Sequence, residues 1–280
     1  MQKAYKKYFA VFVLPTLLAF TVFFIIPFIM GIVLSFCKFT TVTNARFVGF
    51  SNYIRAFSNA DFINALGFTT KFTIVSVITI NIIAFAIAYG LTRGIKGTNF
   101  FRTTFFMPNL IGGIVLGYIW QLMINAVLAN FDVTITSDAK YGFWGLVILM
   151  NWQLIGYMMI IYIAAIQNIP GELIEAAKID GATKTQTMFK VIIPMAMPSI
   201  TICLFLSLTN AFKLFDQNLA LTAGAPSRKT AGLALDIYTT FYNRNGWEGV
   251  GQAKAVVFFI IVGIVSMLQL YITRKREVEE

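Results

Sequence analysis

The stretch YGFWGLVILMNWQLIGYMMIIYIAAIQNIPG, residues 141–171, decides the fold, because it contains no charged side chain between Lys140 and Glu172. About 20 apolar residues suffice to cross a hydrocarbon core roughly 30 Å thick. Inside a bilayer every backbone N–H and C=O needs an internal partner, so such a segment must be helical. This stretch therefore predicts a transmembrane helix.

Five further charge-free runs flank it. They lie between Lys7 and Lys38, Lys71 and Arg93, Arg102 and Asp132, Lys190 and Lys213, and Lys254 and Arg274. Of the 280 residues, 58% are hydrophobic and 12% are charged, about half the charged fraction of a soluble domain. The sequence predicts an all-α integral membrane protein with six transmembrane helices. The first helix is expected to be uncleaved, since its apolar run exceeds a signal-peptide core.

The composition also excludes several classes of protein. No histidine occurs, which removes histidine-dependent metal sites and general bases, and we expect neither a catalytic nor a metal site. Cys37 and Cys203 lie within apolar runs and are too few for a disulfide framework. The net charge of +10 lies in short clusters between the apolar runs rather than on one amphipathic face. We therefore expect it to set topology and not to bind nucleic acid.

The clusters alternate between the two sides of the predicted membrane. Dense, short clusters fall on one side: Lys3, Lys6, Lys7, Arg93, Lys96, Arg102, Lys178, Lys184, Lys190, Arg274, Lys275 and Arg276. Short loops rich in lysine and arginine stay cytoplasmic. Both termini are accordingly predicted to be cytoplasmic, and the outside segments 47–61 and 226–248 to form ordered loops or short interfacial helices.

The loop after the quoted stretch, 169–194, reads as two short helices joined at a glycine. Pro170 ends the preceding span, and Glu172 and Glu175 are expected in the first turn of a new helix, where carboxylates favour the dipole. Gly181 is expected to end that helix in a left-handed conformation. Thr183 and Gln186 match a capping box, so a second helix can start there. By these properties alone, the loop could equally be an ordinary amphipathic segment at the membrane surface.

The loop resembles the EAA motif of ABC-importer permeases, E-A-A, three residues, G, nine residues and I-x-L-P. Glu175-Ala176-Ala177 precede Gly181 at this spacing, and the motif ends as Val191-Ile192-Ile193-Pro194. The segments 47–53 (FVGFSNY), 101–108 (FRTTFFMP) and 221–226 (LTAGAP) resemble further elements of carbohydrate permeases, with Ala225 replacing a glycine. Together they resemble the maltose-type family, and its MalF-like rather than its MalG-like subunit.

The resemblance implies a type I ABC importer permease (MetI-like) fold, with residues 1–68 forming the first helix and first external loop, and residues 69–280 the permease core. It implies uptake of a sugar or oligosaccharide through the cytoplasmic membrane of a bacterium or archaeon. The implied partners are a second permease subunit, a cytoplasmic ATPase dimer that holds ATP and Mg²⁺, and an extracellular or periplasmic solute-binding protein. The residues that would couple to the ATPase are Glu175, Ala176, Ala177, Asp180 and Gly181. No G-x-x-x-x-G-K-[ST] loop occurs, so we expect neither a nucleotide site of that kind nor an enzyme.

Polar residues inside spans usually face the bundle interior. Asn81 is expected to make an interhelical hydrogen bond, and Lys213 and Asp216 are spaced to pair on one helix face. The resemblance places the sugar site on the fourth and fifth spans, where amides and hydroxyls can bind sugar hydroxyls and a ring can stack on an apolar face. The expected substrate-pathway residues are Gln153, Tyr157, Ser207, Asn210 and Lys213.

Three alternatives stay open from the residues alone. A same-fold permease for another solute, such as glycerol phosphate or a polyamine, would be distinguished by its binding protein. An ion-coupled secondary transporter would need buried acids or histidines in the spans, and the six runs contain none. An integral-membrane enzyme would need paired carboxylates or a Cys/His pair within the membrane, and none is present.

Overall fold

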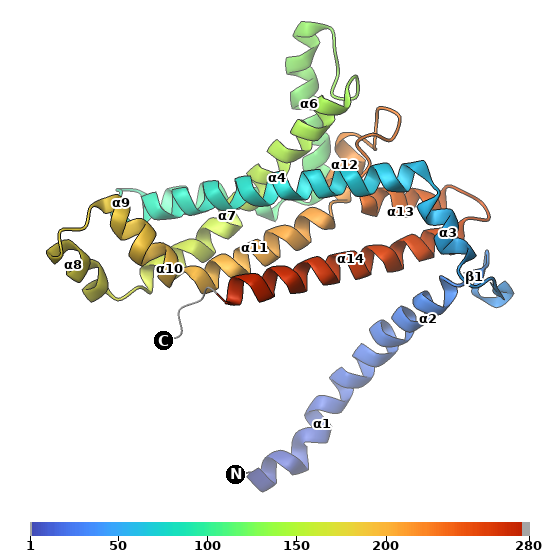
Figure 1. Ribbon diagram of the computed structural model, residues 1–280, viewed down its shortest axis with the longest axis horizontal. Coiled ribbons are helices and arrows are strands. Elements are labelled where there is room, and N and C mark those ends of the chain that lie inside the picture. Colours follow the sequence, from blue (N-terminus) through green and yellow to red (C-terminus); the bar gives the residue numbers. More distant parts are fainter. Residues whose placement is uncertain (1, 276–280) are drawn as a thin grey trace. The chain divides into compact units, whose positions relative to one another are not determined.

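The computed structural model describes residues 2–275, with the side chains of residues 2–8 and 10 left out. Arg276 and the side chains of Lys3, Lys6 and Lys7, which contribute to the predicted topology, lie outside the described residues. The described chain is mostly helical (Figure 1). A two-stranded antiparallel ribbon pairs β1, Cys37–Lys38, with β2, Arg46–Phe47.

Two compact units are distinguished within the chain. The first comprises Met1–Ala60 and Ile237–Phe259, and the second Asp61–Asp236 and Ile260–Glu280. The expected division into residues 1–68 and 69–280 stays a prediction. The first unit contains α1 (Gln2–Phe20), η1 (Thr21–Ile25), α2 (Ile26–Leu34), η2 (Val42–Asn44), α3 (Ser51–Phe57) and the first part of α14 (Glu248–Arg274).

Close backbone approach holds the first unit together. Asn52 is buried on α3, and its side-chain amide donates to the carbonyls of Ser35 (2.9 Å) and Cys37 (2.8 Å). Gly249 of α14 packs against the same Cys37 carbonyl, where a Cβ would leave no room. Within the segment 47–61, expected to form an ordered loop or a short interfacial helix, residues Ser51–Phe57 form a helix that Asn52 fixes, and the interfacial location stays a prediction.

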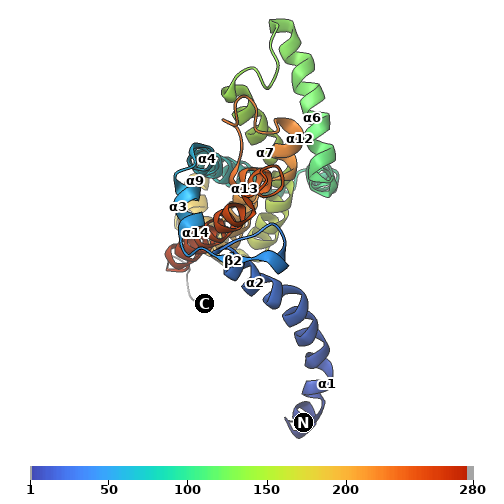
Figure 2. The same cartoon turned by 90° about the vertical axis from the view of Figure 1, so that its right-hand side faces the viewer.

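The second unit contains most of the helices. They are α4 (Ala60–Leu91), α5 (Thr98–Phe106), η3 (Met107–Leu110), α6 (Gly113–Leu128), η4 (Ala129–Phe131), α7 (Ala139–Gln167), α8 (Gly171–Ile179), α9 (Lys184–Thr187), η5 (Met188–Ile192), α10 (Ile193–Met195), α11 (Met197–Phe212), α12 (Asp216–Leu221), the first turn of α13 (Leu233–Tyr242), whose remaining residues belong to the first unit, and the second part of α14. The turned view in Figure 2 shows α6 and α12 side by side. There Gly117 leaves space for the methyl group of Ala220.

The six predicted spans are present, one of them as a bent pair. Five described helices are long and apolar enough to cross a membrane: Val11–Leu34, Ala60–Leu91, Gly113–Phe131, Ala139–Gln167 and Glu248–Arg274. The remaining apolar run forms Lys184–Met195 and Met197–Phe212, which meet at an angle of 71°. Pro194 lies at the end of the first segment and Pro198 in the first turn of the second, on either side of this bend; proline is tolerated in the first turn of a helix but interrupts the hydrogen bonds of a continuous one.

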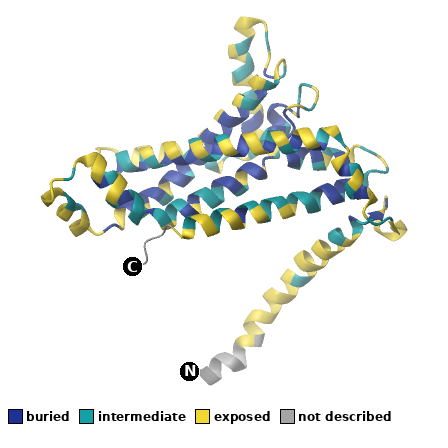
Figure 3. Cartoon of the chain, viewed as in Figure 1, coloured by how far each residue is buried: buried dark blue, intermediate teal, exposed yellow. Residues whose placement is uncertain are grey.

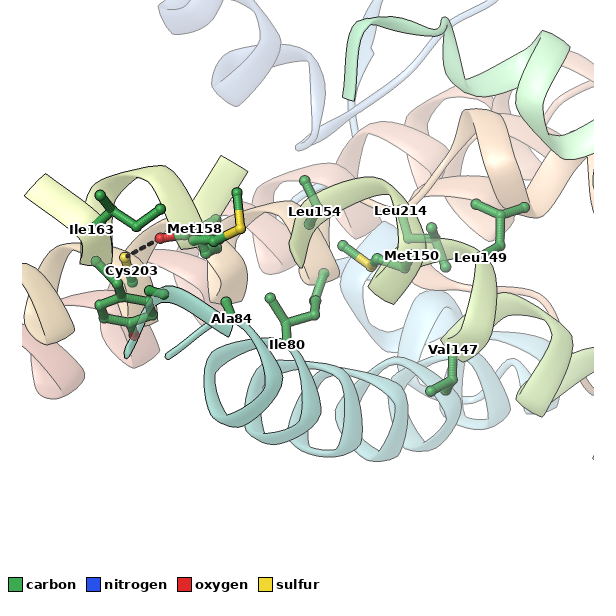
Figure 4. Packing of buried hydrophobic residues seen from close by; sticks show 14 of the residues in the cluster. Ile80, Ala84, Val147, Leu149, Met150, Leu154, Met158, Ile163, Cys203 and Leu214 are labelled. Carbon is green, nitrogen blue, oxygen red and sulfur yellow. Dashed lines mark hydrogen bonds between the residues drawn. The ribbon is translucent and has the colours of Figure 1, made fainter. Parts of the chain in front are cut away.

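The core of the second unit lies between α4, α7 and α11. On α4, Ile80, Ala84, Ala88 and Leu91 recur every three or four residues and are buried together, which is the spacing of one helix face. They face α7, and about two thirds of the residues in the most apolar stretch of α7 are buried. Figure 4 shows Ile80 and Ala84 opposite Leu154 and Met158.

Candidate functional site

The candidate site is the segment that connects α7 to α11. The span α7 ends at Gln167, and Pro170 caps the N-terminus of α8 with a backbone φ of −55°. Glu172 lies in the first turn of α8, where its carboxylate favours the positive end of the helix dipole. The expectation that Glu175 shares this turn is wrong: α8 begins at Gly171, so Glu175 lies one turn further along.

Gly181 ends α8 as the sequence predicts. Its φ is +78°, in the left-handed region that glycine enters without a Cβ clash. The N–H of Ala182 then donates to the carbonyl of Ala177 (2.9 Å), and the N–H of Gly181 to that of Lys178 (3.1 Å). These bonds satisfy the last carbonyls of the helix and turn the chain sharply.

The capping box also forms in full. The N–H of Thr183 donates to Oε1 of Gln186 (2.7 Å), and the N–H of Gln186 donates to Oγ1 of Thr183 (3.3 Å). The helix α9 that starts here continues directly into η5, a π-helical turn, and then into α10 and α11. Such π-helical turns occur frequently at functional sites. Within the second unit, α8 contacts both α9 and η5.

The surface of α8 is almost wholly open (Figure 3). None of its residues is buried, and Glu175, Ala176, Asp180 and Gly181 are all exposed, with Ala177 half-buried. Ile179 is 86% exposed and Leu173 41%. Only Ile174 packs against the hydrophobic cluster of the core. A short helix that is anchored on one side and presents small, apolar and acidic groups on the other has the surface of a docking element.

The predicted pathway residues fall into two groups. Gln153 on α7 is buried, and its Oε1 accepts a hydrogen bond from Nε2 of Gln217 on α12 (2.7 Å). Its own Nε2 donates to the carbonyl of Ile111 (3.3 Å). Gln217 escaped the sequence prediction, although its place one residue after Asp216, just past the fifth apolar run, was a usable signal. Tyr157, one turn after Gln153, is half-buried against the core.

Ser207 belongs instead to a buried polar cluster. It is fully buried, and its hydroxyl accepts a hydrogen bond from Nδ2 of Asn81 (2.8 Å). Oδ1 of Asn81 accepts from the hydroxyl of Tyr162 (2.6 Å). The interhelical hydrogen bond expected of Asn81 is therefore confirmed. Tyr162 was missed because a tyrosine in an apolar run resembles any large core residue.

Asn210 and Lys213 are exposed at the end of α11. Nδ2 of Asn210 donates only to the Leu206 carbonyl of its own helix (2.8 Å). The expectation that Lys213 and Asp216 lie on one helix face is wrong. The helix α11 ends at Phe212 and α12 begins at Asp216, so the two residues flank a turn. In the part of the chain that the structure describes, no ion pair joins them.

Comparisons with known proteins agree with this arrangement. Residues 82–278 match a family described as "Binding-protein-dependent transport system inner membrane component". A curated relative from Thermoanaerobacterium thermosulfurigenes, a probable starch degradation products transport system permease protein, is 45% identical over 96% of this chain and 94% of its own length. A multiple sugar-binding transport system permease protein of Streptococcus mutans is 32% identical over 99% of each chain. Among solved structures, a chain of a bacterial ABC transporter involved in import of the acidic polysaccharide alginate has a TM-score of 0.82, with 19% identity and 98% coverage of both chains.

Proposed function

The chain belongs to the family of binding-protein-dependent transport system inner membrane components, and from that premise we propose that it is the permease subunit of an ATP-driven importer for a sugar or oligosaccharide. It is a multi-pass protein of the cytoplasmic membrane and a transport subunit. The relatives named as permeases for starch degradation products and for multiple sugars support the substrate class. A product of starch degradation is the specific substrate to test first.

The observation that carries the mechanism is the open helix α8. A subunit without its own ATP-hydrolysing loop must receive work from a partner through a surface contact. Glu175, Ala176, Ala177, Asp180 and Gly181 form such a surface, and the small alanines permit close approach of a partner. A partner that binds α8 differently in two states would shift the equilibrium between two conformations of the bundle.

The link from α8 to the bundle supports this role. The helix is tied to the core by Ile174, and it is followed by the Gly181 turn, the capping box and η5. These contacts and turns leave little conformational freedom in the chain between α8 and the bent α10–α11 segment. A displacement of α8 would therefore move α11, which carries Ser207 and Asn210 and is followed directly by Lys213, near one end of the expected substrate pathway.

The remaining partners follow from the same argument. The sequence holds no G-x-x-x-x-G-K-[ST] loop, so we place ATP and Mg²⁺ on a separate cytoplasmic ATPase dimer. A second permease subunit would complete the pathway, and a solute-binding protein outside the membrane would deliver the sugar. One solved relative is a bacterial alginate ABC transporter in complex with a periplasmic protein bound to an alginate pentasaccharide, which supports the last of these partners.

We place α8 in the cytoplasm because of the distribution of basic residues. Figure 1 shows α8 and α9 at the end where α4 stops, and the basic residues Arg93, Lys96, Lys178, Lys184 and Lys190 lie at or near this end of the chain path. Short basic loops remain on the cytoplasmic side. Both termini would then be cytoplasmic, and an accessible-cysteine scan on sealed cells, with labelled sites at residues 180 and 132, tests this orientation.

The decisive experiment is uptake by the full complex in vesicles, with its second permease, ATPase and binding protein. We expect Glu175→Lys and Gly181→Pro to abolish uptake of a labelled starch oligosaccharide while the protein still inserts and assembles. Asp132→Lys is the matched charge reversal, at an exposed acid in the loop after α6, and should transport normally. Normal uptake by both α8 variants would remove the coupling role, and uptake by the permease alone without ATP would indicate an ion-coupled transporter.

A further inference from the structure

A cavity of about 520 Å³ lies at the end of the second unit away from α8, between the first turns of α7, the first half of α4 and the loop before α13. Three lysines from these three segments line it: Lys71 of α4, Lys140 of α7 and Lys229 of the loop. All three are exposed.

The three lysines form no ion pair with a carboxylate among the described residues. Within residues 2–275, none of them has a carboxylate oxygen within the 4.0 Å of an ion pair. Of the acids that are close by in the sequence, two pair with an arginine, and the third lies close to Lys140 without forming an ion pair with its side chain. Arg228 pairs with Asp61 (3.5 Å) and Asp236 (2.8 Å), and Oδ1 of Asp138 caps α7 by accepting from the backbone N–H of Lys140 (2.8 Å).

The wall of the cavity is aromatic. Phe68 of α4 packs edge-on against Phe143 of α7, with ring centroids 5.8 Å apart, and Phe143 contacts Trp144 at 5.4 Å. Trp144 is 54% exposed. These rings belong to two membrane spans, close to the ends where the spans meet the loops. Tryptophan and lysine together at this level are typical of the boundary between the hydrocarbon core and the headgroups.

We propose that this cavity binds an anionic phospholipid, with the phosphate among Lys71, Lys140 and Lys229 and the first part of an acyl chain against Phe68, Phe143 and Trp144. Three cations without a carboxylate partner among the described residues attract an anion. The mostly apolar wall, built on membrane spans, selects an anion that carries a hydrocarbon chain over free phosphate or an acidic protein surface. With the proposed orientation, the lipid belongs to the outer leaflet.

The test uses the assembled complex in nanodiscs of equal parts phosphatidylglycerol and phosphatidylcholine, followed by native mass spectrometry of the retained lipid. We expect phosphatidylglycerol to be retained over phosphatidylcholine by about tenfold or more, and Lys71→Gln/Lys140→Gln to remove most of that preference. Lys38→Gln/Arg46→Gln removes two exposed charges from the β1–β2 ribbon and should leave it unchanged. Comparable melting temperatures of both double variants establish that they fold.

A second measurement distinguishes the sources of the anion. Acetylation of Lys71 and Lys140, read by peptide mass spectrometry, should be slowed by phosphatidylglycerol and not by inorganic phosphate at the same concentration. Equal protection by inorganic phosphate overturns the proposal. The proposal is also overturned if Lys71→Gln/Lys140→Gln retains as much phosphatidylglycerol as the wild type. This holds as well if that variant retains the lipid but loses affinity for the solute-binding protein.

Discussion

The hydroxyl of Tyr162 on α7 donates a hydrogen bond of 2.6 Å to Oδ1 of Asn81 on α4. Nδ2 of Asn81 in turn donates to the hydroxyl of Ser207 on α11 (2.8 Å). Each helix of the central trio thus contributes one polar group to a single chain of hydrogen bonds. The chain fixes the register of α4, α7 and α11 more specifically than apolar packing does, because a slip of one turn would leave buried polar groups without partners.

Tyr162→Phe is therefore expected to destabilise the protein while preserving its shape. The variant leaves Oδ1 of Asn81 without its donor, and interhelical hydrogen bonds in membranes contribute about 0.6–2 kcal/mol. Thermal unfolding of the purified complex measures the effect. Tyr118→Phe, at a tyrosine of α6 that is 57% exposed, is the control and should melt like the wild type. An unchanged melting temperature for Tyr162→Phe would mean that the hydrogen bond contributes nothing to stability.

Gly156→Ala should disrupt the packing of α5 on α7. A Cβ at Gly156 would lie well inside 3.0 Å of the backbone carbonyl of Phe105. Backbone atoms cannot rotate away as a side chain can, so the two helices must separate. Overpacking of this kind costs about 1–3 kcal/mol or more. We expect a lower yield of assembled complex and a lower melting temperature.

Gly263→Ala is the matched control for that substitution. Gly263 lies within α14, and a Cβ there has no neighbour within 4 Å. Alanine favours a helix over glycine by about 1 kcal/mol, so this variant should be as stable as the wild type or more so. Equal stability of Gly156→Ala and Gly263→Ala would show that α5 and α7 do not approach as closely as described.

Gln153 and Gln217 should act together in substrate uptake if they face the sugar. The two side chains share a hydrogen bond of 2.7 Å, so either alanine substitution leaves the other amide with an altered orientation. We expect Gln153→Ala and Gln217→Ala each to raise the KM for uptake by a few fold, corresponding to about 0.5–1.5 kcal/mol per hydrogen bond. The free-energy cost of the double substitution should not exceed the sum of the costs of the two single substitutions.

Uptake of a labelled oligosaccharide over a range of concentrations measures these constants. Asn210→Ala belongs in the same series, because Asn210 is the exposed amide among the predicted pathway residues. Thr209→Ala, which removes a hydroxyl bonded only within α11, is the control. Unchanged kinetics for Gln153→Ala and Asn210→Ala together would remove both residues from the substrate pathway.

The local features of the chain could be predicted because they depend on neighbouring residues. The spans follow from apolar runs of sufficient length, and the end of α8 from a glycine placed where the chain must turn. The capping box at Thr183 and Gln186 likewise needs only a spacing of three residues. Glu175 was wrongly expected in the first turn of α8 because the first residue of this helix was not predicted correctly. The start of a helix depends on where the preceding proline allows the backbone to bend.

The bend in the fifth span could not be predicted from hydropathy. The apolar run between Lys190 and Lys213 is uninterrupted in composition, and only its two prolines hint at the 71° angle that the structure contains. Hydropathy also does not show that the helix breaks between Phe212 and Asp216. Because of this break, Lys213 and Asp216, which were expected to pair on one helix face, lie on either side of a turn. Hydropathy reports length and depth in the membrane, whereas direction depends on what the segment packs against.

The sequence by itself determined the membrane character, the six spans, the glycine-terminated helix and its capping box, because each depends on solvation or on hydrogen bonds between residues a few positions apart. Only the tertiary structure brought Tyr162 to Asn81 and Ser207, joined Gln153 to Gln217, and gathered Lys71, Lys140 and Lys229 around one cavity. Those partners lie far apart along the chain, and their meeting depends on the close packing of α4, α7 and the segments that follow them. Periodicity along one helix identifies the face that is buried, but not the residue that lies opposite.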